Sequence, residues 1–292
     1  RIEGVTLFYP DSIKPALRQV EINLNKGEFA FVVGPVGAGK TTLIRMLIGE
    51  LRPRRGRVLV DDKVVGAIDG WDIPELRRRV GVMLQDAHLL PARSVWENTA
   101  FVLEMTGVPP ATVKRRVDHA LSVVGLAHKA RAYPRELSGG EQKRACLARA
   151  IVRVPPLLLA DEPTGELDTQ TAGEVFEMLR ELNRTFGVTV VMVTHYPGVA
   201  HFVDRVVNIR DGRISSESYS SPTFQRQGDR VEEEYLVVDR SGRLQLPQEM
   251  TEQFGVGGLA KAGLEDGTVT IKPIGDRPRP SRGNYRRENP ES

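Results

Sequence analysis

The sequence of 292 residues has little of several features that would narrow the class of protein. It contains a single cysteine, Cys146, so no disulfide can form within the chain and we expect a reducing compartment. No apolar run approaches the roughly 20 residues needed to span a bilayer, and no signal-like segment opens the sequence. The formal net charge of +3 is too small to identify a partner. Any role at a membrane must therefore depend on another protein.

The rest of the composition is typical of a globular protein, with 40% hydrophobic and 27% charged residues. The length allows one large domain and a small second one. Cys146 lies in the run EQKRACLARAIV, which predicts a buried helix, so we interpret it as a core residue rather than a reactive thiol. Because Arg1 stands directly at a predicted strand, we expect the natural chain to begin upstream.

The stretch Gly34 to Thr41, GPVGAGKT, fits the phosphate-loop pattern of glycine, four residues, glycine, lysine and serine or threonine. It follows an apolar run that predicts a buried strand and precedes TLIRMLIGEL, whose apolar residues recur at helical spacing. The glycines let successive N–H groups and the positive end of the helix face one point, where a polyphosphate belongs. Lys40 can reach the β- and γ-phosphates, and the Thr41 hydroxyl can ligate Mg²⁺.

Two further apolar runs predict strands of a parallel sheet that is covered on both faces. LLLADE, residues 157–162, ends in two carboxylates, and VTVVMVTH, residues 188–195, ends in His195. Adjacent buried carboxylates are costly unless a metal or a catalytic water uses them. Because an open α/β sheet binds its ligand at the carboxyl ends of its parallel strands, we expect these residues to lie near the phosphate loop. A histidine considered by itself is better interpreted as structural, but the position of His195 at the end of this strand favours a functional role.

The middle of the chain is predicted to be helical. Residues 86–136 contain two helical stripes punctuated by prolines, which indicates a helical subdomain inserted between strands. LSGGEQ, residues 137–142, then opens another helix, with Ser138 as the N-cap and Glu141 completing a capping box. Its two glycines make a second possible phosphate site, although this signal is weak by itself.

Taken together, GPVGAGKT, Gln85, LSGGEQ, LLLADEP and His195 in this order resemble the nucleotide-binding subunits of ABC transporters, over residues 1 to about 215. LQDAHLLPARSVWEN and LLLADEPTGELD are most similar to the cell-division branch of that family, FtsE. The resemblance implies an α/β fold of the phosphate-loop NTPase type, with a mixed sheet core, an antiparallel β subdomain and a helical subdomain. It predicts an ATP-binding domain over residues 1–214.

The resemblance also implies roles for individual residues. Tyr9 would stack on adenine, Glu162 would be the general base, His195 would bind the γ-phosphate, and Asp168 would lie at a dimer seam. Mg²⁺ would be held through Thr41, Gln85 and Asp161, with Gln85 also contacting the attacking water. Residues implied to bind ATP are Tyr9, Gly34, Pro35, Val36, Gly37, Ala38, Gly39, Lys40, Thr41, Thr42, Ser138, Gly139 and Gly140. The last three would serve ATP on the opposite subunit, so hydrolysis would require a homodimer. Lys143 stands where glutamine is commoner, and we expect little consequence.

The partner implied is a membrane protein, FtsX-like or another transmembrane permease subunit. The chain would then be cytoplasmic and peripheral to the inner face of the membrane, and would regulate cell-wall hydrolysis in division. The alternative is the ATPase of a lipoprotein-release or macrolide-type exporter. A third, less favoured reading is a DNA-linked ATPase that acts through the carboxyl-terminal region.

The carboxyl-terminal region divides into three predicted parts. Residues 215–234 are polar without periodicity and predict a linker, and residues 275–292 predict a disordered tail. Residues 235–274 resemble the small β-rich swapped-hairpin domain of AbrB and SpoVT-type regulators. From Glu232 to Ile274 there are eight acidic and four basic residues, a net charge of −4 that disfavours nucleic acid. We therefore expect this domain to reinforce a dimer or to regulate.

Overall fold

The computed structural model of the chain forms two compact units, residues 1–245 and 246–292, which are considered separately below. The residues that it describes are 1–66, 73–86, 88–165, 167–194, 203–221, 231–238, 244, 259–265 and 268–274.

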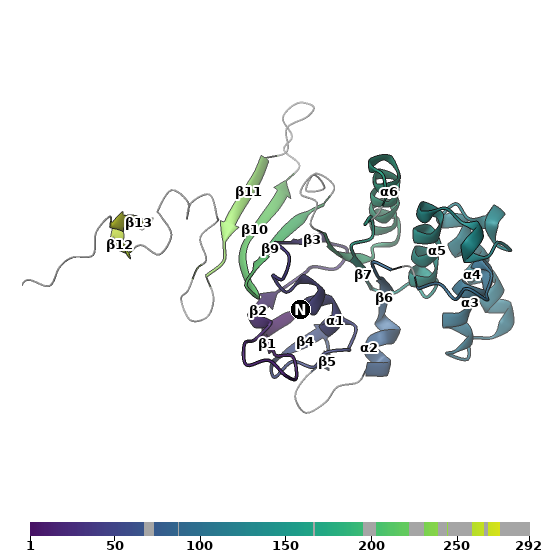
Figure 1. Cartoon of the computed structure of the whole chain (residues 1–292), viewed down its shortest axis with the longest axis horizontal. Helices are drawn as coiled ribbons and strands as arrows, with labels where there is room; N and C mark the ends of the chain where they lie inside the picture. Colours follow the sequence, from purple (N-terminus) through teal and green to yellow (C-terminus); the bar gives the residue numbers. More distant parts are fainter. Residues whose placement is uncertain are drawn as a thin grey trace, which may run out of the picture. The chain divides into compact units, whose positions relative to one another are not determined.

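The first unit is built on a seven-stranded mixed sheet in the order β11-β10-β9-β3-β8-β7-β6 (Figure 1). Strands β9, β3, β8, β7 and β6 run parallel, and β10 and β11 continue the sheet antiparallel. The bounds are β3 (Phe29–Val33), β6 (Val80–Met83), β7 (Leu157–Asp161), β8 (Thr189–Val193), β9 (Arg205–Arg210), β10 (Arg213–Ser221) and β11 (Val231–Leu236).

Alternate side chains of the parallel strands enter two different hydrophobic cores. In β8, Val190 and Met192 join the core that contains residues of α5 and α6, whereas Val191 and Val193 join the core that contains α1. This explains why the strand is apolar throughout, and it confirms the prediction of a parallel sheet buried on both faces. Cys146 is 1% exposed in the first of these cores, and burial raises its pKa to about 11, as expected of a core thiol.

A separate four-stranded antiparallel sheet, in the order β2-β1-β4-β5, packs against the second core. Its strands supply Val5, Leu7 and Val20, while the helix α1 supplies Leu43 and Ile44. The bounds are β1 (Ile2–Leu7), β2 (Leu17–Ile22), β4 (Arg55–Val60), β5 (Lys63–Gly66) and α1 (Lys40–Leu47). This is the antiparallel part of the predicted fold.

The predicted helices of the middle of the chain are present, and Figure 1 shows α3, α4 and α5 grouped together on the β6 side of the sheet. Ser94 and Ser138 each close a capping box, and the second of these was predicted from LSGGEQ. The bounds are α2 (Ile73–Arg79), α3 (Val95–Glu104), α4 (Pro110–Val123), α5 (Gly139–Ile151) and α6 (Thr169–Phe186), with short 3₁₀ helices η1 (Ala127–Lys129) and η2 (Pro134–Glu136).

The predicted linker over residues 215–234 is wrong in most of its length. β10 pairs with β9, and β11 pairs with β10 from Ser216 opposite Leu236 to Ser221 opposite Val231. The alternation of a strand is hidden in the sequence because Ser216, 3% exposed, occupies an inward position where an apolar residue is usual. A buried Arg205 side chain on β9 also bonds to Glu217 of β10 at 2.5 Å. The first unit therefore extends past the predicted boundary at residue 214, to residue 245.

The second unit contains one described hairpin, β12 (Leu259–Glu265) and β13 (Thr268–Ile274). The predicted strand TVTIKP lies in β13, whereas the predicted helix PQEMTEQFG and the tail 275–292 fall outside the described residues. The charge argument also changes, because Glu232, Glu233 and Glu234 belong to β11 of the first unit. Residues 246–292 carry seven residues of each sign, a net charge of zero rather than an acidic one.

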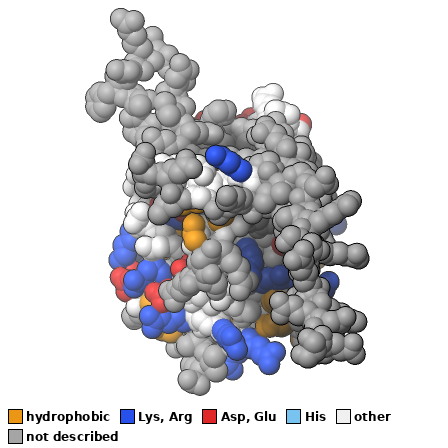
Figure 2. Space-filling model, turned by 90° about the vertical axis from the view of Figure 1, so that its left-hand side faces the viewer, with side chains coloured by type: hydrophobic (Ala, Val, Ile, Leu, Met, Phe, Trp, Pro, Cys, Tyr) orange, Lys and Arg blue, Asp and Glu red, His pale blue; other side chains and the backbone are white. Residues whose placement is uncertain are grey.

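The described helices include none that is long and apolar enough to cross a membrane. On the face shown in Figure 2, Lys and Arg side chains are interspersed with Asp and Glu among the described residues. That face therefore carries charges of both signs close together.

Candidate nucleotide site

The phosphate loop connects β3 to α1 and contacts the β9–β10 hairpin on one side. Gly212 donates its N–H to the carbonyl of Ala38 at 2.9 Å, and Ala38 is itself buried. A Cβ atom added to Gly34 would overlap the carbonyl oxygen of Ile209, so only glycine fits there. Val36, in contrast, is 97% exposed. One side of the loop is therefore packed against the β9–β10 hairpin, and the other side is open to solvent.

Lys40 begins α1 and its side chain folds back over the loop. The ammonium Nζ donates to the carbonyl oxygens of Gly34 at 2.7 Å and Pro35 at 3.0 Å. Lys40 is 8% exposed, and these two bonds stabilise its buried charge. A triphosphate lying in the loop would meet this ammonium and the free N–H groups at the start of α1.

Three hydroxyl groups lie at the start of α1 and near it. Thr41 is exposed, so its hydroxyl can reach a ligand. Thr42 is buried and its hydroxyl lies 3.1 Å from the hydroxyl of Tyr9, which comes from the segment after β1. The Arg45 guanidinium lies 6.0 Å from the centre of the Tyr9 ring. Tyr9 is thereby tied to the same helix that carries the phosphate loop.

Asp161 ends β7 and Glu162 follows it; in the sheet, β8 lies between β7 and the phosphate-loop strand β3. Asp161 is 8% exposed, and one of its carboxylate oxygens, Oδ1, is buried without a hydrogen-bond partner. Burial raises the pKa of Asp161, the neighbouring Glu162 raises it further, and Lys40 opposes the shift. Glu162 has a backbone φ of 46°, which is uncommon for a residue with a side chain. Its N–H donates to Val193 at 2.9 Å and holds the turn against β8.

These residues fit a divalent cation that is shared with a phosphate. The partnerless oxygen of Asp161 is a hard ligand of the kind that Mg²⁺ prefers, and the exposed Thr41 hydroxyl is a second. Among the described residues there is no group of three or more His, Cys, Asp or Glu side chains that could hold a metal by itself. This agrees with the way Mg²⁺ is commonly bound, through one or two protein ligands plus phosphate oxygens.

Gln85 follows β6 and lies close to the turn that contains Glu162. Its Cγ atom is 3.9 Å from the position that a Cβ atom would take at Gly165, and Gly165 N–H donates to the carbonyl of Glu162 at 3.0 Å. The carbonyl of Gln85 accepts a hydrogen bond from the ammonium of Lys143 on α5. The sequence carried no signal for this contact, since the two residues are 58 positions apart.

Ser138, Gly139 and Gly140 form the start of α5. The first two are exposed, whereas a Cβ atom at Gly140 would lie 2.5 Å from the Thr171 side chain on α6. Asp168 caps α6 by accepting from the N–H of Thr171 at 2.9 Å. Hydrogen bonds from Thr171 lower the pKa of Asp168. Within the described ranges, no hydrogen bond joins the first turn of α5 to the phosphate loop of the same chain.

One predicted site residue, His195, is not described. It directly follows Thr194, which is buried at the end of β8, but it lies outside the described residues itself. The structure therefore brings Tyr9, the phosphate loop, Asp161, Glu162 and Gln85 to the carboxyl ends of the parallel strands.

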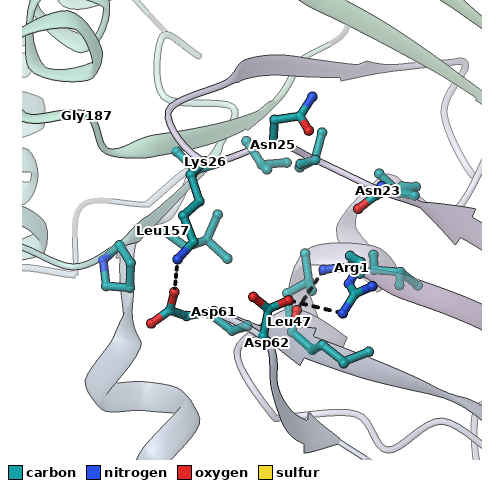
Figure 3. Close-up of a pocket in the computed structure, with 17 residues that line it drawn as sticks. Arg1, Asn23, Asn25, Lys26, Leu47, Asp61, Asp62, Leu157 and Gly187 are labelled. Carbon is teal, nitrogen blue, oxygen red and sulfur yellow. Dashed lines mark hydrogen bonds and ion pairs between the residues drawn. The ribbon is translucent and has the colours of Figure 1, made fainter.

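A cavity of about 340 Å³ lies at the amino ends of β7 and β8, opposite to the phosphate loop. Its lining includes Leu47, Leu157 and Val191, and its charged groups are paired with one another. Figure 3 shows Lys26 reaching Asp61, at 2.7 Å, and Arg1 reaching Asp62, at 3.0 Å. None of the predicted site residues lines this cavity.

Comparisons with known proteins agree with this geometry. The sequence signature of the ABC transporter family matches residues 17–165. The cell-division ATP-binding protein FtsE of Bacillus subtilis is 46% identical over 207 residues, which are 70% of this chain and 90% of that protein. The methionine import ATP-binding protein MetN of Carboxydothermus hydrogenoformans is 37% identical over 253 residues, 85% of this chain and 74% of that protein.

A solved structure supports the same assignment. The chain resembles the dimeric ATP-binding cassette MJ0796 bound to ADP and Pi, with a TM-score of 0.67 and 32% identity over 75% of this chain and 97% of that one. The predicted fold is therefore confirmed. The chain belongs to the ABC transporter family, and it is an ATP-binding ATPase subunit of that family.

Proposed function

We propose that this chain is an FtsE-like ATPase subunit, which dimerises on ATP and acts on a separate FtsX-like membrane protein in the regulation of cell-wall hydrolysis. The observation that carries the proposal is the match to FtsE proteins over nearly their whole length, at 42% to 46% identity in Bacillus subtilis and Mycobacterium tuberculosis. The chain would then work at the inner face of the cell membrane, held there by its partner.

In the proposed site the phosphate loop and Lys40 bind the triphosphate, and the Tyr9 ring stacks on adenine. Lys40 exchanges its two loop carbonyls for the β- and γ-phosphates, while the loop N–H groups bind the remaining oxygens. Thr41 and Asp161, with Gln85, would hold Mg²⁺, which neutralises phosphate charge when bound. This role explains why a buried carboxylate without a hydrogen-bond partner is kept at the end of β7.

Glu162 is proposed as the general base. Its carboxylate accepts the proton of the attacking water as the water oxygen bonds to the γ-phosphorus and the bond from phosphorus to the β,γ-bridging oxygen breaks. The left-handed backbone at Glu162 turns the chain sharply at the end of β7, so that residues 161 and 162 can serve the same phosphate from different sides. Gln85, close to this turn, would orient the water, and His195 would bind the γ-phosphate.

The exposed first turn of α5 is proposed to complete the site of a second copy. Ser138 and Gly139 are accessible, and the amide groups at this helix start suit a phosphate. Asp168, at the start of α6 beside Gly140, would lie at the same seam. Two sites would form between two copies, and hydrolysis would require the dimer.

The test of the proposal is recovery of the membrane partner. The Glu162→Gln form is incubated with ATP and used to capture proteins from detergent-solubilised membranes, which are then identified. We expect a division-type protein with few transmembrane helices and a large extracytoplasmic loop. The matched control is Lys40→Ala, which should neither bind ATP nor retain the partner in an ATP-dependent way. Recovery of no membrane protein by the Glu162→Gln form would contradict the proposal.

A second candidate is the ATPase of an importer of the MetN type. The specific observation is that the similarity to MetN covers 253 residues, against 207 for FtsE, and so includes more of this chain. In the same experiment, this candidate predicts recovery of a permease with several transmembrane helices. The exporter reading remains a prediction with the same readout, and the permease identified would separate the two.

For residues 246–292 we propose a role in dimerisation or regulation. The resemblance to swapped-hairpin domains, which dimerise, supports this role, and the net charge of zero gives no electrostatic support to DNA binding. Deleting residues after 245 should weaken self-association while ATP binding is kept, as measured by analytical ultracentrifugation with and without ATP. Salt-sensitive binding of duplex DNA by the full chain would favour the DNA-linked alternative instead.

A further inference from the structure

Helix α5 makes two contacts with the segment that follows β6. The Lys143 ammonium donates to the carbonyl oxygen of Gln85, and the Arg149 guanidinium donates to the carbonyl oxygen of His88 at 2.8 Å. Both basic residues lie on the same broad side of the helix as Cys146, and both lower the pKa of its thiol against the larger effect of burial. The segment from Gln85 to His88 is thus fastened to α5 at both of its ends.

The Lys143 side of this contact is buried, whereas Gln85 is exposed. Lys143 is 7% exposed, although lysine is among the residues that are rarely buried. A buried ammonium is costly unless it is hydrogen-bonded, so the contact with Gln85 favours one position of the chain at this point. The long Lys143 side chain reaches Gln85 from within the helix that begins at Ser138.

On its other side, Gln85 lies against the turn of the proposed general base. Its Cγ atom is within 3.9 Å of the Cβ position at Gly165, and Gly165 is hydrogen-bonded to Glu162. Gln85 is therefore placed between α5 and the Glu162 turn. A change in the Lys143 contact would move the backbone of Gln85 and, with it, the side chain whose Cγ atom lies beside this turn.

We infer that Lys143 is a positioning residue for Gln85, because it holds the Gln85 carbonyl against α5. The inference rests on the proposed function, because Gln85 and Glu162 must take part in hydrolysis for their placement to matter. It goes beyond that function by assigning a role in hydrolysis to Lys143, which lies outside the proposed site. Lys143, where we expected little consequence, becomes the connecting group.

The test compares three substitutions at one position. Lys143→Met keeps the length of the side chain and removes its donors, Lys143→Arg keeps a charged donor, and Lys143→Gln keeps a neutral donor. We expect kcat to fall by about tenfold or more in Lys143→Met, in line with the loss of one charge-assisted hydrogen bond. The KM for ATP and the Kd of a fluorescent ATP analogue should change less than about twofold, because the phosphate loop is untouched. Lys143→Arg should recover most of kcat, and Lys143→Gln should lie between.

Lys129→Met is the matched control, since it removes a lysine from the same helical region. Lys129 is paired with Glu141 at 3.6 Å near the surface, and its loss should leave kcat within about twofold. Equal losses of ATP binding and kcat in Lys143→Met would indicate a merely structural residue and would overturn the inference, as would an unchanged kcat. If Lys143→Met does not fold, Lys143→Gln decides, and a kcat equal to that of the unaltered chain overturns the inference.

Failure of this inference is distinguishable from failure of the proposed function. If Glu162→Gln retains full turnover, Glu162 is not the general base, and the inference about Lys143 fails together with the proposed function. If Glu162→Gln is inactive and Lys143→Met is fully active, the proposed function stands and only the link through Gln85 is lost.

Discussion

The two ends of the parallel strands differ in how their polar groups are satisfied. At the amino ends there is a cavity of about 340 Å³, but Lys26 and Asp61, like Arg1 and Asp62, pair with each other (Figure 3). At the carboxyl ends, Asp161 has a buried oxygen without a hydrogen-bond partner, and Glu162 has a strained backbone. A polar group left unsatisfied in the fold has a free-energy cost, which a ligand can remove. The buried oxygen without a hydrogen-bond partner, rather than the presence of a cavity, therefore indicates which end of the strands binds the ligand.

The largest expected effect is at Glu162. Glu162→Gln should lower the rate of phosphate release by about a hundredfold or more, because the amide cannot accept the proton of the water. ATP binding should be kept, as measured with a fluorescent analogue, since the phosphate loop is intact. If the variant retains more than about a tenth of the turnover, the carboxyl ends of the parallel strands do not supply the general base through Glu162.

A matched pair of glycine substitutions tests the rigidity of the loop. In Gly34→Ala the new methyl group meets the backbone of Ile209, which cannot move without the sheet, so ATP binding should be lost and the Tm lowered by several degrees. In Gly37→Ala nothing lies within 4 Å of the methyl group, and only the cost of a left-handed backbone remains, about 1 kcal/mol. Equal effects of the two substitutions on Tm would contradict the conclusion that the backbone of Ile209 leaves no room for a side chain at Gly34.

Asp161→Asn should separate stability from activity. Burial, with Glu162 nearby, raises the pKa of Asp161 in the folded state above its unfolded value. The folded state then binds the proton more tightly, so stability falls as the pH rises from the unfolded pKa through the folded pKa, and stays lower above it. The asparagine avoids this penalty, and the nucleotide-free variant should gain roughly 1–4 °C in Tm at pH 7 while losing hydrolysis. The gain should shrink near pH 4, and a lower Tm at pH 7 would contradict the argument.

The smallest effect is expected at the other end of the strands. Lys26→Ala removes an ion pair in which Lys26 is 81% exposed, while Asp61 keeps its second pair, with Arg79 at 3.0 Å; such surface pairs contribute about 0–1 kcal/mol. ATP turnover should stay within about twofold, and the Tm should change by no more than a few degrees. A large loss of turnover would show that the cavity takes part in the chemistry.

Local features of the chain were predictable, and distant contacts were not. The phosphate loop and the capping box at Ser138 depend on residues within four or eight positions, so their geometry follows from short patterns. The strand β10 was not predicted because buried serines such as Ser216 hide the alternation of an inward face. The contact of Lys143 with Gln85 depends on how α5 packs against β6, which no short pattern specifies.

The two hydrogen bonds of Lys40 to its own loop have a consequence for selectivity. Two of the three N–H donors of the Lys40 ammonium are held by the carbonyls of Gly34 and Pro35, so one donor is left for a small anion such as free phosphate. A triphosphate also engages the amides along the loop and the helix start, which adds contacts. A triphosphate therefore gains more contacts than a short anion does, and we expect free phosphate to compete poorly for the loop.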